Sequence, residues 1–227
     1  MAEAVAASEK SPNAWAQAIA AAVMISALGG GLLAFQKASA HSADEPATCS
    51  ADKKDKPSKR VSGAELCTAL NRADLPTLLG TPREHAVTAD GSQSSLKLAS
   101  GTEIATPEAT VTLATYSVKL SRSYDDLPVA GTADLLGDAE TKTVLGHPAV
   151  LYSDRTIALS FNLGGGKVDT GPGGIARSLL VAPDAKDGGG SFEMAIWRQD
   201  SVIPDDAALL RVAEKVLPTL PGWRAAG

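Results

Sequence analysis

The longest apolar stretch of the chain runs from Ala14 to Phe35 and contains no charged residue. As an α-helix rising about 1.5 Å per residue it would extend roughly 33 Å, enough to cross a hydrocarbon core about 30 Å thick. The residues before it, 1–13, carry few charges and no basic cluster. The pattern predicts a transmembrane anchor over 14–35, preceded by a short cytoplasmic tail over 1–13.

A cleaved signal peptide is the main alternative for this stretch. Ala38, Ser39 and Ala40 form an A-x-A sequence typical of signal-peptide cleavage sites, so cleavage after Ala40 would release everything that follows. The apolar run is longer than the usual apolar region of about 7 to 15 residues, and it lacks a basic leader. These features favour a retained signal-anchor, while secretion after cleavage stays open.

A polar, basic linker is predicted over 36–60, because this stretch has no apolar periodicity. Its basic residues gather near its end: Lys53, Lys54, Lys56, Lys59 and Arg60. By the positive-inside rule such a run favours a domain in the cytoplasm, whereas the A-x-A sequence and the cysteine placement favour a domain outside. We expect a single-pass cell-membrane protein with its soluble domain outside, and a cytoplasmic domain is the alternative.

From Val61 onward the apolar positions recur with the periods of folded structure, so 61–227 is predicted to form one globular extracytoplasmic domain. Ser62 and Glu65 fit a capping box at the start of its first helix. The final helix should begin near Pro204 and bury an apolar stripe made of Leu209, Val212, Ala213 and Val216. Other helices are predicted over 63–72, 74–79 and 127–136.

Between the helices the apolar period falls to two, which predicts strands. The longest of them, 109–122, changes its apolar face midway, because Val111 is odd-numbered and Val118 is even-numbered. This change predicts a bulge near Thr115 or a strand covered on both faces. The remaining strands are predicted over 85–89, 95–99, 141–145, 148–152, 156–163, 175–182 and 191–198.

The Ser153, Asp154, Arg155 sequence looks like a tight turn, so 148–152 and 156–163 are predicted to form a hairpin. Helices at both ends of the domain with hairpins between them indicate an α+β fold. We expect an antiparallel sheet of about six to eight strands packed with the N- and C-terminal helices.

Composition excludes one class of partner. The formal net charge is −5, so the chain lacks the excess of basic residues that is typical of nucleic-acid-binding proteins. Aromatic residues make up only 4% of the chain, so the core must rest on aliphatic side chains.

The chain has two cysteines, Cys49 and Cys67. Outside the cell we expect them to form a disulfide, which for a loop of this size stabilises the fold by roughly 3 kcal/mol in the chain-entropy model. In a reducing compartment both would be free thiols. The histidines, His41, His85 and His147, show no ligand spacing with them, so no metal site is predicted.

Two features resemble catalytic or cofactor motifs but fail in detail. The glycine-rich stretch 164–174 lacks the Walker pattern, because Phe161 stands where the first glycine should be and Val168 follows the lysine. His147, Ser153 and Asp154 supply the residue types of a catalytic triad without a G-x-S-x-G elbow. We therefore predict no cofactor and no catalytic residues, with His147 in a turn.

The sequences VSGAELCTALNRADLPTLLG, TVLGHPAVLYSDRTIALSF, DTGPGGIARSLLVAPDAKDGGG and PDDAALLRVAEKVLP resemble an uncharacterised family of actinobacterial membrane-anchored proteins, a domain of unknown function. The resemblance covers nearly all of 49–223 and implies an N-terminal anchor with an extracytoplasmic domain. More loosely, the cysteine on an early helix followed by LLG is similar to envelope lipoproteins whose fold is like PsbP and Mog1.

No activity follows from the sequence. The leading hypothesis is a non-enzymatic, membrane-tethered module outside the cell that binds an envelope protein or polymer. The alternative is a carrier of a small apolar ligand between sheet and helix, and an envelope hydrolase comes third. The sequence assigns no ligand-binding residues.

Overall fold

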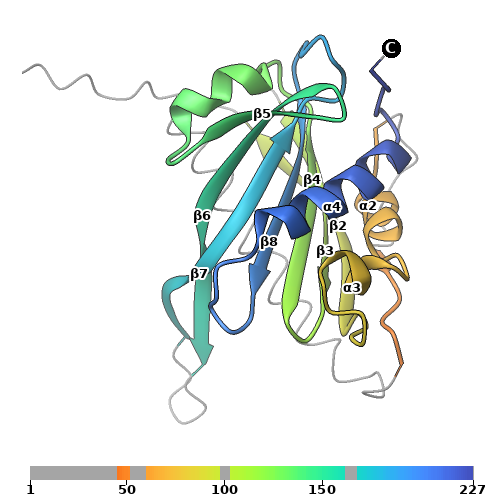
Figure 1. The fold of residues 1–227 in the computed structure, drawn as a ribbon, viewed down its shortest axis with the longest axis vertical. Coiled ribbons are helices and arrows are strands. Elements are labelled where there is room, and N and C mark those ends of the chain that lie inside the picture. The colour runs from red at the N-terminus through yellow and green to blue at the C-terminus, as the bar shows by residue number, and fades with distance from the viewer. Residues whose placement is uncertain (1–44, 52–59, 98–102, 162–167, 227) are drawn as a thin grey trace, which may run out of the picture.

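The computed structural model describes residues 45–51, 60–97, 103–161 and 168–226 (Figure 1). The predicted tail, the anchor, the cleavage site at Ala40 and most of the linker lie outside these residues. Within them, no helix has both the length and the apolar character needed to span a membrane.

The described strands form one eight-stranded sheet in the order β1-β2-β3-β4-β8-β7-β6-β5. Strand β1 runs parallel to β2, and every other neighbouring pair is antiparallel. The strands are β1 Ser50–Ala51, β2 Thr88–Lys97, β3 Glu103–Thr112, β4 Tyr116–Ser123, β5 Glu140–Val144, β6 His147–Phe161, β7 Val168–Val181 and β8 Ser191–Arg198.

The helices pack against this sheet and confirm the predicted α+β class. They are α2 Gly63–Leu70, α3 Leu75–Leu78 and α4 Asp206–Val216, with short 3-10 helices η2 Val129–Leu135 and η3 Leu217–Thr219. Helices α2 and α4 share one buried cluster with the strands and cover the same face of the sheet (Figure 1). The stripe predicted for α4 is confirmed, because its members are fully buried: Leu209, Val212, Ala213 and Val216.

The opposite face is covered differently. Among the described residues only η2, beside β5 and β6 in Figure 1, packs on it. This second, small cluster joins Val129 of η2 to Val150 and Tyr152 of β6 and to Ala182 after β7. Most of this face therefore carries no helix in the described part of the chain.

The predicted strand over 109–122 is wrong, because it is two strands. Strand β3 ends at Thr112, β4 begins at Tyr116, and the Leu113 N–H donates to the Tyr116 carbonyl at 2.7 Å. The change of apolar face at Thr115 marks this reversal, since the returning strand points its even-numbered side chains into the same core. The alternatives of a bulge or a doubly covered strand do not apply.

The predicted hairpin at Ser153, Asp154 and Arg155 is also wrong. These residues lie inside β6, which continues from His147 to Phe161. These polar residues remain in strand conformation because β7 pairs with β6 on both sides of them, with a register shift between Arg155 and Ile157. Part of the predicted glycine loop, 168–174, belongs to β7, where a Cβ on Gly173 would come within 2.8 Å of the Thr156 carbonyl oxygen. The preceding glycines lie outside the described residues.

Several other elements have shifted bounds. The predicted helix over 127–136 is the 3-10 helix η2, and the predicted strand over 85–89 is mostly a connection, with β2 beginning at Thr88. The strand over 191–198 is confirmed with the same bounds. The capping box of α2 is confirmed by reciprocal bonds between Ser62 and Glu65.

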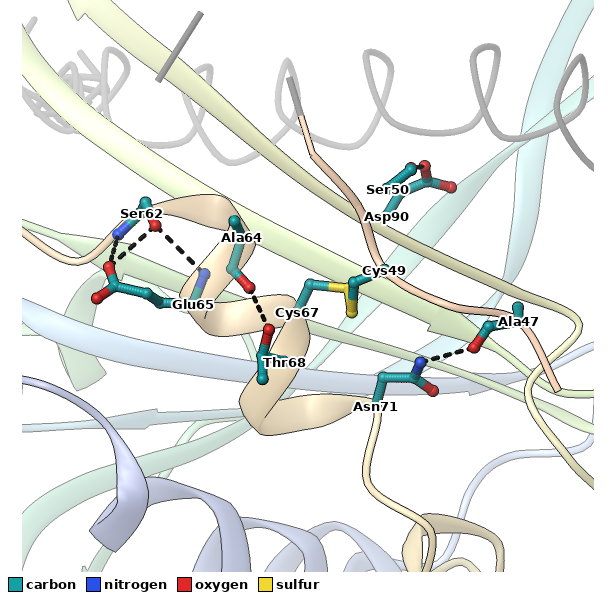
Figure 2. Close-up of a disulfide and its surroundings, with 10 residues drawn as sticks. All are labelled: Ala47, Cys49, Ser50, Ser62, Ala64, Glu65, Cys67, Thr68, Asn71 and Asp90. Carbon is teal, nitrogen blue, oxygen red and sulfur yellow. Dashed lines mark hydrogen bonds between the residues drawn. A yellow bond between two sulfur atoms is a disulfide. The ribbon is translucent and has the colours of Figure 1, made fainter. Parts of the chain in front are cut away.

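Residues 45–51 extend the folded domain into the stretch predicted as linker (Figure 2). Cys49 is joined to Cys67 of α2 by a disulfide. The Ala47 N–H donates to the Ala86 carbonyl, and the Asn71 side-chain amide donates to the Ala47 carbonyl, each at 2.8 Å. Ser50 of β1 also contacts Asp90 of β2. The chain is therefore fixed to the domain before β1.

Candidate binding face of the sheet

The sheet face that points away from α2 and α4 is polar, and we call it the polar face. Side chains point to alternate faces of a strand, and cross-strand partners share a face. The registers place two rows of side chains across it. One row contains Ser92, Glu108, Ser121 and Glu193 from β2, β3, β4 and β8; the next contains Asp90, Thr110, Lys119, Ala195, Ser178 and Tyr152 from β2, β3, β4, β8, β7 and β6.

Glu193 is the acceptor at the centre of this face. Tyr152 donates to its Oε1 at 2.6 Å, and Ser121 donates to its Oε2 at 3.4 Å. The tyrosine therefore reaches over β7 to hold the carboxylate in place. Burial of Tyr152 raises the pKa of its phenol well above the ordinary value of 10.0, and the nearby charge of Glu193 raises this pKa further. The phenol stays protonated and acts as a donor.

A buried ion pair lies beside it. The Lys119 ammonium is 2.9 Å from Oε2 of Glu108, and both side chains are largely buried. Oε2 has no hydrogen bond of good geometry to any group, whereas Oε1 accepts from Ser92 at 3.4 Å. The ammonium is close to Oε2 but approaches it away from the directions of the oxygen lone pairs. The contact is therefore mainly electrostatic and is not a well-directed hydrogen bond.

A further row of the polar face, beside these two, contains an aromatic side chain. Ser117 of β4 is opposite Trp197 of β8, which is opposite Ala176 of β7. Gln199 donates to the Ser117 hydroxyl at 2.7 Å. Trp197 is partly exposed, whereas the small residues around it are only 2–9% exposed: Ser117, Ser178, Ala176 and Ala195. Small residues thus lie beside the larger Trp197 side chain.

Charge on the polar face is unbalanced. Asp90, Glu108 and Glu193 carry carboxylates. Asp154 of β6 adds another, because it lies opposite Ala176 in the same row as Trp197. Against them, Lys119 is the ammonium that the register places in the two rows. The face is therefore acidic, and its groups suit reversible ion pairing and hydrogen bonding with a polar partner.

The structure separates the residue types that resemble a catalytic triad. His147 is the first residue of β6, and Asp154 lies seven positions along the same strand, which at about 3.3 Å per residue is roughly 23 Å away. The Ser153 hydroxyl accepts from Arg177, and Asp154 accepts from the Arg155 N–H at 2.7 Å. These residues form no triad.

The interpretation of His147 as a turn residue is wrong. Its side chain is fully buried, its Nδ1 lies 2.8 Å from the Ala182 carbonyl, and its ring stacks on Trp223 with centroids 4.0 Å apart. This contact holds the C-terminal segment on the sheet, where Trp223 packs against the core. His147 is thus a packing residue.

Other candidate sites are limited. The described residues contain no group of three metal-ligating side chains close enough to hold an ion. Two hollows in the described part are open to solvent rather than enclosed. One is lined by Arg60, Gln93, Ser94, Ser95 and Ala105, the other by Ala64, Glu65, Thr68, Ala69, Thr219 and Pro221. Neither offers a closed space between sheet and helix.

Residues 9–139 match the profile of a family described as a family of unknown function, DUF6215. The chain belongs to this family. This confirms the assignment to an uncharacterised domain family made from the sequence. The DUF6215 match ends before β5, so Glu108 and Lys119 lie inside it and Tyr152 and Glu193 lie beyond it. No curated protein and no solved structure matches the chain, so the looser likeness to PsbP and Mog1 stays a prediction.

Sequence reasoning missed the polar face. Its members are far apart in the chain and carry no motif. The available signal was the alternation within each strand, for example Lys119 between the buried Val118 and Leu120. That signal indicates that one side of a single strand is polar. Only the pairing register shows that the polar sides of neighbouring strands form one continuous face.

Proposed function

We propose that this protein is a non-enzymatic, membrane-tethered module of the cell envelope that binds a protein or polymer through the polar face. The observation that supports this proposal most directly is the pair of rows across the sheet, in which Tyr152 and Ser121 orient Glu193 on a face without a helix over most of its described area. A carboxylate held by donors on rigid strands is preorganised for binding.

Two further features support the location. The apolar stretch 14–35 suits an uncleaved anchor, and the disulfide between Cys49 and Cys67 suits an oxidising compartment. The predicted orientation places the soluble domain outside the cell. External protease added to intact cells should then remove the domain, and protection until the cells are lysed would contradict this half of the proposal.

Site-specific photocrosslinking of the full chain in its native membrane tests the binding face. A photoreactive benzoylphenylalanine replaces Trp197 on the polar face, and in a matched control it replaces Glu214, which is exposed on α4. We expect adducts from position 197 that disappear when Glu193→Gln is added. Adducts that form from position 214 alone, or that persist unchanged with Glu193→Gln, would place the binding surface elsewhere.

A further inference from the structure

Strand β5 is an edge strand of the described sheet, and most of its side chains are exposed. It is the last strand in the sheet order, and no described strand pairs with its outer side. Its side chains from Glu140 to Thr143 are all exposed, although they point alternately to both faces. A free strand edge of this kind presents unpaired N–H and C=O groups that can pair with another strand.

The turn after β5 shows which backbone groups point outward. Leu145 and Gly146 have φ of 52° and 80°, which fits a type I′ turn that hydrogen-bonds the flanking pair, Val144 and His147. Because hydrogen-bonded and non-hydrogen-bonded pairs alternate in an antiparallel ladder, Thr141 and Thr143 direct their N–H and C=O groups to the free edge. Consistently, the carbonyl of Pro148, opposite Thr143, accepts from Ala182 on the other side of β6.

Two charges on β5 select a partner. Glu140 and Lys142 lie on the same side of the strand, with the ammonium 2.7 Å from the carboxylate. If a second β5 runs antiparallel with Thr141 opposite Thr141, each Glu140 faces a Lys142 of the other copy. In the neighbouring register Lys142 would face Lys142, and like charges directly opposite are unfavourable. The charge pattern of β5 is therefore complementary to itself in one register.

We propose that β5 pairs antiparallel with β5 of a second copy of this chain, with Thr141 opposite Thr141, so that the two sheets become continuous. This inference does not depend on the function of the polar face. The edge donor and acceptor of Thr141 are used, and four charges of alternating sign gather around the two-fold axis.

Exposed apolar side chains flank the same strand and support this pairing. Leu135 at the end of η2 is 53% exposed, and Leu145 in the turn after β5 is 40% exposed. Leu145 follows β5 and η2 precedes it, so antiparallel pairing brings Leu145 of one copy to the same end of the paired strands as η2 of the other copy. Pairing would thus place exposed apolar surface next to the partner's backbone. The strand contact is small compared with a standard interface of about 1,600 Å², so we expect weak association.

Cysteine crosslinking of the full chain tests the register. Both native cysteines are in the disulfide, so Thr141→Cys introduces a single free thiol. In the proposed pairing two copies of residue 141 are directly opposite, about 5.5 Å apart between Cα atoms, which suits a disulfide. Thr143→Cys is the matched control, because two copies of residue 143 would be offset by about 13 Å. We expect at least tenfold more crosslinked homodimer from T141C.

Equal crosslinking of the two variants, preferential crosslinking of T143C, or a T141C adduct with a different protein would overturn the proposal. A charge series measured by analytical ultracentrifugation gives a second readout. Lys142→Glu should weaken the dimer at least tenfold, because Glu140 then faces a glutamate, and the double variant E140K/K142E should restore it. An unchanged dissociation constant in K142E, or a chain that is monomeric at every concentration, would also overturn it.

Discussion

The hydroxyl of Tyr152 on β6 donates a 2.6 Å hydrogen bond to Glu193 on β8, crossing the intervening strand β7. This bond ties together three strands of the polar face, and it keeps a carboxylate oriented without neutralising it. Substitution of either residue therefore tests how much this bond stabilises the sheet.

Removal of the phenol should be costly. In Tyr152→Phe, Oε1 of the partly buried Glu193 loses its donor, and hydrogen bonds to charged groups contribute about 1.5–3 kcal/mol. We expect a fall of about 1–3 kcal/mol in the free energy of unfolding, measured by urea denaturation. Ser94→Ala, which removes an exposed hydroxyl on β2, should change it by less than about 0.5 kcal/mol. A Tyr152→Phe protein as stable as the parent would contradict the importance of this bond.

The same tyrosine predicts a pH dependence. Its pKa is raised in the folded state, so its contribution to stability is fully present below pH 10.0 and is lost as the pH rises from there through the raised folded-state pKa. The unfolding free energy of the parent should therefore fall more steeply above about pH 10 than that of Tyr152→Phe. Parallel curves in alkaline urea titrations would show that Tyr152 does not titrate in this way.

Two glycines at the crossing of α2 and β2 should tolerate no side chain. A Cβ on Gly63 would lie closer than 3.0 Å to backbone atoms of Ser92, and one on Gly91 would be similarly close to the backbone of Gly63. Backbone cannot move aside as a flexible side chain can, so Gly63→Ala and Gly91→Ala should each cost about 2–4 kcal/mol. In Gly131→Ala the new Cβ meets nothing within 4 Å, and this variant should unfold like the parent.

The ion pair between Lys119 and Glu108 should show strong coupling. Lys119→Ala leaves a buried carboxylate without its ammonium, so we expect a loss of about 1–3 kcal/mol. Combining it with Glu108→Gln removes the unpaired charge and should recover part of the stability. Equilibrium unfolding of the single and double variants gives the coupling energy directly. Strictly additive effects would mean that the two side chains act independently.

Reduction should destabilise the domain. The disulfide closes a loop with a sequence separation of 18, and a loop of this size is worth about 3 kcal/mol in the chain-entropy model. A reducing agent should therefore lower the melting temperature of the parent and leave Cys49→Ala/Cys67→Ala unaffected. In intact cells neither cysteine should be alkylated by a maleimide, and ready labelling without prior reduction would favour the cytoplasmic alternative.

Local sequence signals predicted the parts of the fold that depend on local physics. The stripe of α4 and the capping box of α2 follow from helical spacing and cap chemistry, and β8 followed from its alternation. The turn at Thr115 was detectable as a change of face, but alternation alone does not distinguish a bulge from a reversal. In β6 the polar residues Ser153, Asp154 and Arg155 looked like a turn. They lie within a strand because they pair with β7, and this pairing is not visible in the local sequence.

The candidate site was harder to predict from the sequence than the fold. Cys49 and Cys67 were singled out because cysteines are rare and chemically distinctive. Glu108, Tyr152 and Glu193 are common residue types whose proximity arises from the pairing order of β3, β4, β8, β7 and β6. No spacing in the chain encodes that order, so the polar face emerges only when the register is known.

The disulfide near the N-terminus also has a mechanical consequence. Strand β1 is only two residues long, and β2 is its one neighbour among the described strands, so a pull on the preceding segment would break its hydrogen bonds one after another. Cys49 lies just before β1 and is bonded to α2, whose side chains are inserted in the main core. Tension that enters through residues 45–48 therefore passes into the helix through a covalent bond, and the edge of the sheet carries none of the load.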